Sequence, residues 1–276
     1  CSLVPDEDRL AFSVFITVDS AGKPLKCAFS RSIIHSRLRL TYEQAMSGLK
    51  VPDGQPCKMA GLSATHVCLL KDLSRLAQQF RRRRFAAYAL DLDMPDYEIV
   101  LRPDGSVADV RKVPYDKSHQ LVEECMVAAN EAVDQELSRR GLPLIHRIHE
   151  PPLARKIEDL KGKLEEMGFA PGDLSRRENL VRFLQSVEDS PMFGPVQTAV
   201  LRSMCKAVYS PSAEGHFGLA KKYYAHFTSP IRRYPDLVVH RILATALEGK
   251  PTPYRVPELK ILSDQCSETE QRAEQA

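Results

Sequence analysis

Hydrophobic and polar residues alternate over the first part of the chain. Residues 10–18 (LAFSVFITV) and 25–34 (LKCAFSRSII) are rich in Phe, Val and Ile, and the DSAGKP segment between them supplies a Gly/Pro turn. This pattern predicts an antiparallel hairpin. Further strands are expected at 86–92, 97–101 and 107–113, the last two separated by a PDG turn.

Apolar residues at helical spacing predict the remaining elements. Val67, Leu70, Leu73, Leu76 and Phe80 recur every three or four residues and give one apolar face to a helix that ends in the run Arg81–Arg84. A second long helix is expected over 117–140, with Gly141 as its C-terminal cap. Shorter helices are predicted between Pro151–Pro152 and Gly168, over LVRFLQSV after residue 178, and at 194–208, 236–248 and 256–276.

Two Ser/Thr-x-x-Glu/Gln patterns resemble capping boxes. Thr41 with Gln44 places Tyr42 in the first turn of a short helix, and Ser175 with Glu178 precedes another helix. The elements together predict an α+β fold. Antiparallel strands are expected mainly in residues 10–115, packed with long helices, and the chain is mostly helical after residue 115.

Composition describes a globular chain and restricts its class only moderately. The 276 residues are 43% hydrophobic and 27% charged, and the net charge of +3 says little about partners. The seven cysteines are scattered without a CxxC pair, which favours free thiols in a reducing cytoplasm over disulfides or structural zinc. No run of 18 apolar residues and no signal-peptide pattern is present.

The segment 215–241 is the most informative stretch, because it interleaves cations with aromatic rings. The segment contains one acidic residue, Asp236, among its several cations. Cations suit phosphates and rings stack on bases, so the segment favours a single-stranded nucleic acid. The alternative is a basic loop beside a helix, with the aromatic rings in the core. The residues concerned are Lys221, Lys222, Arg232, Arg233 and Arg241, with Phe217, Tyr223, Tyr224, Phe227 and Tyr234.

The order of residues within this segment resembles a known family. HFTSPIRRYPDLVVHR (226–241) is similar to the signature of the ribonuclease II / ribonuclease R (RNB) exoribonucleases, and the resemblance extends over nearly the whole chain. It implies the RNB catalytic-domain fold and a processive 3′→5′ exoribonuclease. Such an enzyme acts on single-stranded RNA, releases nucleoside 5′-monophosphates and uses a divalent metal, usually Mg²⁺. Other matching segments are CSLVPDEDRLAFSVFITVD (1–19), VEECMVAAN (122–130), HRIHEPP (146–152) and LRSMCKAVYS (201–210).

The resemblance also assigns roles to residues. Arg232 matches the arginine that stabilises the transition state at the scissile phosphate, so it is the expected catalytic residue. Tyr42 matches the tyrosine that clamps the terminal nucleotides. Glu123 matches the acid that contacts the last ribose, whereas its neighbour Glu124 is expected to face solvent. The other expected substrate-binding residues are Thr228, Ser229, Arg233 and Tyr234.

The family's metal-binding aspartates lie upstream of the CSL motif, at which this chain begins. We therefore expect residues 1–276 to be a catalytic domain without its aspartate-bearing part, inactive or severely impaired alone, and we assign no metal ligand. Residues 255–276 are expected to begin a helix that leads to an absent C-terminal RNA-binding barrel. The partners implied are single-stranded RNA and other RNA-decay proteins, with no membrane.

Other candidate sites are weaker. Asp91, Asp93 and Asp96 alternate at strand spacing, but the stretch is more typical of a strand that ends in a Pro turn. His146 and His149 lack a third ligand nearby, which favours a structural or RNA-facing role. The run Arg81–Arg84 suits either RNA phosphates or the negative end of a helix dipole. The alternatives to an enzymatic function are a non-catalytic RNA-binding scaffold and a plain α+β interaction domain.

Overall fold

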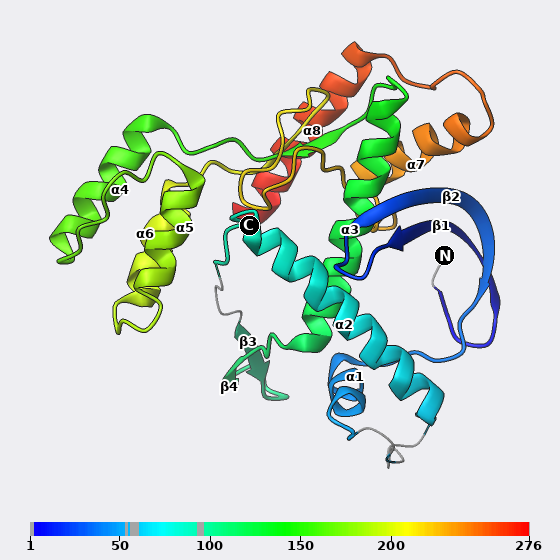
Figure 1. Ribbon diagram of the computed structural model, residues 1–276, viewed down its shortest axis with the longest axis horizontal. Coiled ribbons are helices and arrows are strands. Elements are labelled where there is room, and N and C mark those ends of the chain that lie inside the picture. The colour runs from blue at the N-terminus through cyan, green and yellow to red at the C-terminus, as the bar shows by residue number, and fades with distance from the viewer. Residues whose placement is uncertain (1–2, 53–54, 56–60, 93–96, 276) are drawn as a thin grey trace.

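The structure is a computed structural model and describes residues 3–52, 55, 61–92 and 97–275. Three small antiparallel sheets, each of two strands, lie among long helices in this part of the chain (Figure 1). The expected α+β class, with most strands before residue 115 and mainly helices after it, is confirmed. The elements are β1 (Asp8–Val18), β2 (Pro24–His35), α1 (Tyr42–Leu49), α2 (Ala64–Ala86), β3 (Tyr97–Leu101), β4 (Val107–Lys112), α3 (Lys117–Arg139), β5 (His146–Ile148), α4 (Ala154–Glu166), α5 (Arg177–Ser186), α6 (Phe193–Ser203), β6 (Val208–Ser210), α7 (Tyr234–Leu247) and α8 (Val256–Gln275).

The first hairpin forms as the alternating pattern predicts. β1 pairs antiparallel with β2 from Asp8 opposite His35 onwards, and the hydroxyls of Ser13 and Ser32 are hydrogen-bonded across the strands at 2.7 Å. Gly22, at φ 75°, supplies the left-handed turn residue that only glycine adopts readily. In Figure 1 the hairpin curves along one side of the molecule, beside α3.

Side-chain caps determine where three helices begin. The predicted box at α1 is present: the Thr41 hydroxyl accepts the Gln44 amide, and the Gln44 side chain accepts the Thr41 amide. Ser63 with His66 and Asp116 with His119 form equivalent boxes at α2 and α3, in which a histidine replaces the usual Glu or Gln. The sequence does not predict these two boxes, because the usual pattern has Glu or Gln, and not His, at the third helical position.

Three local predictions are wrong. Residues 87–92 form no strand, because α2 continues to Ala86 and Tyr88 has φ 61°. Ser175 and Glu178 form no capping box, since α5 begins after Arg176 without a side-chain cap. The helix expected at 194–208 ends at Ser203, and residues 208–210 become strand β6.

Strand β6 forms because it has a distant partner. It pairs antiparallel with β5, with Arg147 opposite Tyr209, some sixty positions along the chain. Three-residue strands carry too little hydrophobic pattern to be recognised from sequence, and the pairing joins segments that only the tertiary fold brings together.

The buried apolar residues of the described chain form two hydrophobic cores. The main core packs α3, α7, α8 and the β5–β6 pair, and Phe12, Val14 and Phe29 of the first hairpin lie against it. The second core belongs to α4, α5 and α6, which form a separate lobe at the left of Figure 1. Helix α3 is the element that reaches from the first hairpin and α2 to α7, so residues on its faces connect most of the candidate site.

Candidate nucleic-acid interface

The loop at 228–233 owes its shape to one buried carboxylate. Asp236, in the first turn of α7 and 0% exposed, accepts the Ser229 amide at 2.7 Å and both forks of the Arg233 guanidinium at 2.8 and 2.9 Å. The Ser229 carbonyl in turn accepts the amides of Arg232 and Arg233 at 3.3 and 3.0 Å. The loop is therefore a turn whose backbone is held by hydrogen bonds.

The side chains of this loop differ in what they can offer a ligand. Arg232 is exposed, and its guanidinium has no hydrogen-bond or ion-pair partner among the described residues. Tyr234 is 45% exposed, whereas Arg233 is occupied by Asp236. The Thr228 hydroxyl oxygen is buried and has no hydrogen-bond partner within the described chain. Arg232 is thus the cation of this loop that is free to meet an anionic ligand.

Asn130 ties this loop to helix α3. It is 2% exposed, its side-chain oxygen accepts the Phe227 amide at 2.9 Å, and its nitrogen donates to the Tyr224 hydroxyl at 3.1 Å. Glu123 lies seven residues earlier on α3, which places it on the same face about 10 Å along the axis. One helix face therefore carries both the predicted ribose contact and the anchor of the Arg232 loop.

The N-terminal half of α3 also meets Tyr42. The Tyr42 ring stacks on His119 with centroids 3.9 Å apart and planes at 19°, and the Tyr115 ring lies 6.1 Å from the same histidine, tilted by 39°. The Tyr115 hydroxyl donates a hydrogen bond to Glu123. Tyr42 is 46% exposed and Tyr115 is 45% exposed, so the predicted tyrosine and the predicted acid belong to one surface cluster.

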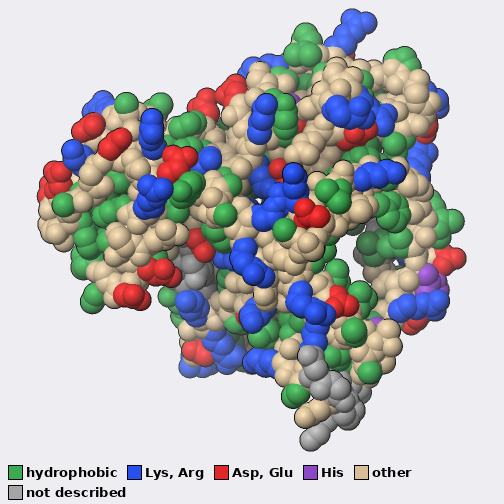
Figure 2. Space-filling model, viewed as in Figure 1, with side chains coloured by type: hydrophobic (Ala, Val, Ile, Leu, Met, Phe, Trp, Pro, Cys, Tyr) green, Lys and Arg blue, Asp and Glu red, His purple; other side chains and the backbone are tan. Residues whose placement is uncertain are grey.

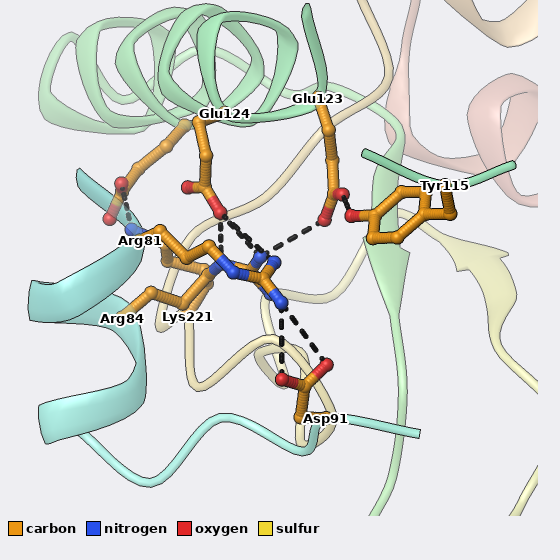
Figure 3. A network of polar contacts seen from close by, with 8 residues as sticks. Arg81, Arg84, Asp91, Tyr115, Glu123, Glu124 and Lys221 are labelled. Atoms are coloured by element: carbon orange, nitrogen blue, oxygen red, sulfur yellow. Dashed lines mark hydrogen bonds and ion pairs between the residues drawn. The ribbon is translucent and has the colours of Figure 1, made fainter. Parts of the chain in front are cut away.

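A network of ion pairs lies beneath this cluster (Figure 3). Arg84 is 6% exposed and donates to Glu123 Oε1 at 3.0 Å and to Glu124 Oε1 at 2.5 and 3.1 Å. The expectation that Glu124 faces solvent is wrong: Glu124 is 1% exposed, because it neutralises a buried guanidinium. Arg81 pairs with Asp91 at 3.1 Å, and its other nitrogen lies 3.9 Å from Glu124.

The run Arg81–Arg84 consequently serves the protein's interior more than its surface. Arg81 and Arg84 have carboxylate partners, and Arg83 donates to the Gly22 carbonyl at the hairpin turn. The sequence singles out Arg84 only as part of this run and does not predict its pairs with Glu123 and Glu124. The available signal was that a cation in the last turns of a helix needs a counter-ion when it falls on the buried face.

A cavity of about 340 Å³ lies between the first hairpin, α2 and α3. Figure 2 shows the molecule hollowed beside the hairpin, with Lys and Arg side chains gathered along the middle of this face. The basic lining residues are Lys23, Arg83, Arg84 and Lys221, and the acidic ones are Glu124 and Glu131. Because Lys221 pairs with Glu131 and Arg84 with Glu124, two of these four positive charges are compensated.

The segment 215–241 combines both of the alternatives that its composition left open. Tyr224 and Phe227 are only 7% and 5% exposed and belong to the core, and Lys221 is ion-paired. Arg232 and Tyr234 face solvent. The segment is therefore part core and part exposed cationic loop, because only the tertiary packing decides which rings are covered.

No group of three or more His, Cys, Asp or Glu side chains with metal-site geometry exists among the described residues. Asp91 is committed to Arg81, and Asp93 and Asp96 lie outside the described residues. His146 pairs with buried Asp134 at 2.6 Å, and His149 bonds to the Cys205 carbonyl at 2.9 Å. The described residues thus do not fit the Mg²⁺ that the resemblance implies, and we derive no reaction step through a metal from them.

Known proteins resemble this chain in sequence and in fold. A family model described as RNB domain matches residues 1–249. Ribonuclease R of Aquifex aeolicus is 37% identical over 92% of this chain and 36% of its own length. Mycoplasma genitalium RNase R, solved in complex with ribose methylated single-stranded RNA, superimposes with a TM-score of 0.89 at 27% identity, over 98% of this chain and 43% of that chain.

The chain therefore belongs to the RNB-domain family, and its relatives by sequence carry the name Ribonuclease R. It spans just over a third of the length of the curated relatives that it matches, 36% and 39% for two of them. Yeast Ssd1, a protein described as a pseudonuclease, shares the fold with a TM-score of 0.72 at 21% identity, over 96% of this chain and 32% of its own. No helix within the described ranges is long and apolar enough to cross a membrane.

Proposed function

We propose that this chain is the RNA-binding and transition-state-stabilising portion of a 3′→5′ exoribonuclease that hydrolyses single-stranded RNA to nucleoside 5′-monophosphates. The observation that carries the proposal is the Arg232 loop. A guanidinium without a partner among the described residues projects from a turn that Asp236 and Asn130 hold in place. Such preorganised positive charge is what stabilises the charge that develops on a phosphoryl group.

Each remaining site residue has a distinct part in this function. Tyr42, braced by His119, offers a half-exposed ring for stacking on a terminal base. Glu123 offers carboxylate oxygens to ribose hydroxyls, which is how a site separates RNA from DNA. Arg233 acts through Asp236 as a support of the loop rather than as a direct phosphate contact. Thr228, Ser229 and Tyr234 line the same turn and are proposed to border the RNA.

The proposed activity depends on a divalent metal and takes place in the cytoplasm. Mg²⁺ dependence follows the family resemblance. Since the described residues hold no cluster of three or more possible metal ligands, the chain alone is proposed to bind RNA without degrading it efficiently. A cytoplasmic location agrees with the free thiols of Cys27, Cys68, Cys125, Cys205 and Cys266 in the described chain.

The experiment compares the chain alone with the chain preceded by an aspartate-bearing segment of an RNB relative. With 5′-labelled single-stranded RNA and Mg²⁺, the extended protein is expected to shorten the RNA progressively from the 3′ end and to spare DNA of the same sequence. Internal cuts would contradict an exonuclease.

The second candidate is an RNA-binding scaffold without catalysis, which the fold shared with a described pseudonuclease favours. It predicts tight RNA binding and no shortening by either protein. A plain interaction domain predicts no affinity for single-stranded RNA.

A further inference from the structure

The Glu123 carboxylate is held at both of its oxygens. Arg84 donates to Oε1 at 3.0 Å, and the Tyr115 hydroxyl donates to Oε2. We propose that Tyr115 and Arg84 are positioning residues that orient Glu123 for the vicinal hydroxyls of the 3′-terminal ribose. This inference rests on the proposed function, which assigns Glu123 to that ribose.

The geometry restricts how the carboxylate can turn. The two donors approach from different elements, Arg84 from α2 and Tyr115 from the segment before α3, and each meets a different oxygen (Figure 3). Rotating the carboxylate would break both hydrogen bonds at once. A carboxylate has about four acceptor positions, so two remain for a ligand after these donors are counted. Two hydroxyls of one sugar match that number.

The two adjacent glutamates divide their tasks by burial. The Glu124 side chain is 2% exposed and takes the Nε side of the Arg84 guanidinium, whereas the Glu123 side chain is 33% exposed. Glu124 supplies the buried counter-charge, and Glu123 presents its remaining acceptor positions to solvent.

The charge of the network favours a neutral hydrogen-bond donor. Two guanidinium groups, of Arg81 and Arg84, face the carboxylates of Asp91, Glu123 and Glu124. The network therefore carries one uncompensated negative charge. Of the two adjacent glutamates, Glu123 is the one whose carboxylate reaches solvent. A phosphate would be repelled here, whereas sugar hydroxyls would donate to the carboxylate.

Tyr115 is suited to act as a permanent donor. Burial and the hydrogen bond to Glu123 raise the pKa of its hydroxyl well above the ordinary value, so the proton stays on Tyr115 at every working pH. Its ring also shares His119 with Tyr42. Tyr115 therefore lies where the carboxylate and the stacking ring meet, which is where the sugar and base of one nucleotide would lie.

The test measures the binding preference of this chain for a terminal ribose. Two 5′-fluorescein-labelled single-stranded RNAs of the same sequence are compared, one ending in a ribonucleotide and the other in a 2′-deoxyribonucleotide. The wild-type protein is expected to bind the first more tightly, and Glu123→Gln to remove the preference. Tyr115→Phe is expected to lower the preference about fivefold, the effect of losing one hydrogen bond, with affinity for the deoxy-ended RNA unchanged.

The double variant separates positioning from a direct contact. If Tyr115 acts through Glu123, the Tyr115→Phe/Glu123→Gln protein should have the same preference as Glu123→Gln. Tyr88→Phe is the matched control, because it removes another tyrosine hydroxyl that bonds an arginine, Arg182, away from Glu123. Arg84→Lys keeps the charge but loses the fork and should also reduce the preference. If it fails to fold, the Tyr115 variants decide.

Each other result overturns a specific statement. A wild-type protein without preference, or a preference that survives in Glu123→Gln, ends the assignment of Glu123 to the ribose and this inference with it. A preference lost in Glu123→Gln but intact in Tyr115→Phe leaves the proposed function standing and ends the positioning role. Equal weakening of both RNAs by Tyr115→Phe means that Tyr115 supports binding in general, which also contradicts positioning.

Discussion

Whether a side chain in this site is available to a ligand depends on whether it already has a partner within the protein. Arg232 and Arg233 are neighbours of identical chemistry, yet only Arg233 has a carboxylate, because Asp236 lies three residues further on and inside the first turn of α7. Glu123 and Glu124 differ in the same way, since only Glu124 is fully buried against Arg84. The difference in burial determines which residue of each pair can serve a ligand.

In the protein extended by an aspartate-bearing segment, Arg232→Ala is expected to lower turnover by a factor of about 10² or more. RNA affinity should stay nearly unchanged, because the positive charge of Arg232 acts mainly in the transition state. Single-turnover rates and equilibrium binding measure the two effects. Lys260→Ala, which removes an exposed cation paired with Asp264, is the control and should change neither. Equal losses in rate and affinity would show that Arg232 only holds RNA.

Asp236→Asn is expected to destabilise the fold by about 3 kcal/mol, because it leaves the Arg233 guanidinium without its counter-charge in a buried position. Chemical denaturation measures the free energy of unfolding. The matched control is Asp264→Asn, whose pair with Lys260 is exposed and is worth less than about 0.5 kcal/mol. Similar small effects in both variants would mean that Asp236 does not hold the loop.

At the scale of elements, helix α3 organises the site. Its face carries Glu123 near one end of the site and Asn130 at the other, and Asn130 satisfies the backbone of Phe227 immediately before the loop. The segment 215–226 is joined to the end of β5 through partly buried histidines, which include His149 and His216 at 5.1 Å between ring centroids. These contacts make the position of the loop depend on both elements.

Asn130→Ala is expected to cost about 2 kcal/mol of stability, since the Phe227 amide and the Tyr224 hydroxyl lose their buried partner. It should also reduce turnover, because Arg232 would no longer be held in place. Thermal unfolding and RNA cleavage rates measure these outcomes. Gln135→Ala, an exposed position of the same helix, is expected to be neutral.

Stability is expected to fall as the pH is lowered from 7 to 5. Burial lowers the pKa of His226 to about 2 and that of His216 to about 3, with nearby cationic groups adding to the effect. An unfolded histidine titrates near pH 6.5, so below that pH the unfolded chain binds protons that the native state does not. The loss approaches about 1.4 kcal/mol per pH unit for each histidine.

Denaturation midpoints measured between pH 5 and 8 check this expectation. Above pH 7 the two histidines are neutral in both states and contribute no slope. His226→Asn should make the fall between pH 7 and 5 shallower, and an unchanged fall in this variant would contradict the assignment to His226.

At the scale of the whole molecule, the lobe of α4, α5 and α6 is an insertion whose two ends meet. The Cys205 thiol donates to the Pro151 carbonyl at 3.3 Å, and the His149 ring bonds to the Cys205 carbonyl at 2.9 Å. The lobe has its own hydrophobic core, although Leu90, Leu92 and Phe217 of the main body pack against it.

Replacing residues 154–203 by a short Gly-Ser linker is therefore expected to leave the main body folded, because the chain ends to be joined already lie together. The remaining protein should show one cooperative thermal transition and keep its near-ultraviolet circular dichroism, apart from the contribution of Tyr88, which loses its contact with Arg182. Loss of cooperativity would show that the lobe is required for the main core.

Features that depend on local pattern could be predicted from the amino-acid sequence. Alternation at 10–18 and 25–34 was sufficient for the first hairpin, and Thr41 with Gln44 was sufficient for the start of α1, because strand pairing across a short turn and helix capping are decided by neighbouring residues. The signature at 226–241 was sufficient for the family, which the comparisons confirm. The roles assigned to Arg232, Tyr42 and Glu123 remain predictions.

The pairing of groups from distant segments could be seen only in the folded protein. The β5–β6 pairing, the burial of Glu124 against Arg84 and the contact of Tyr115 with Glu123 join residues from separate elements. The sequence does not show whether a charged side chain is solvated by water or paired with another side chain. The physical reason is that burial and counter-ions come from distant segments, and these determine whether a charge holds the fold together or remains available to a ligand.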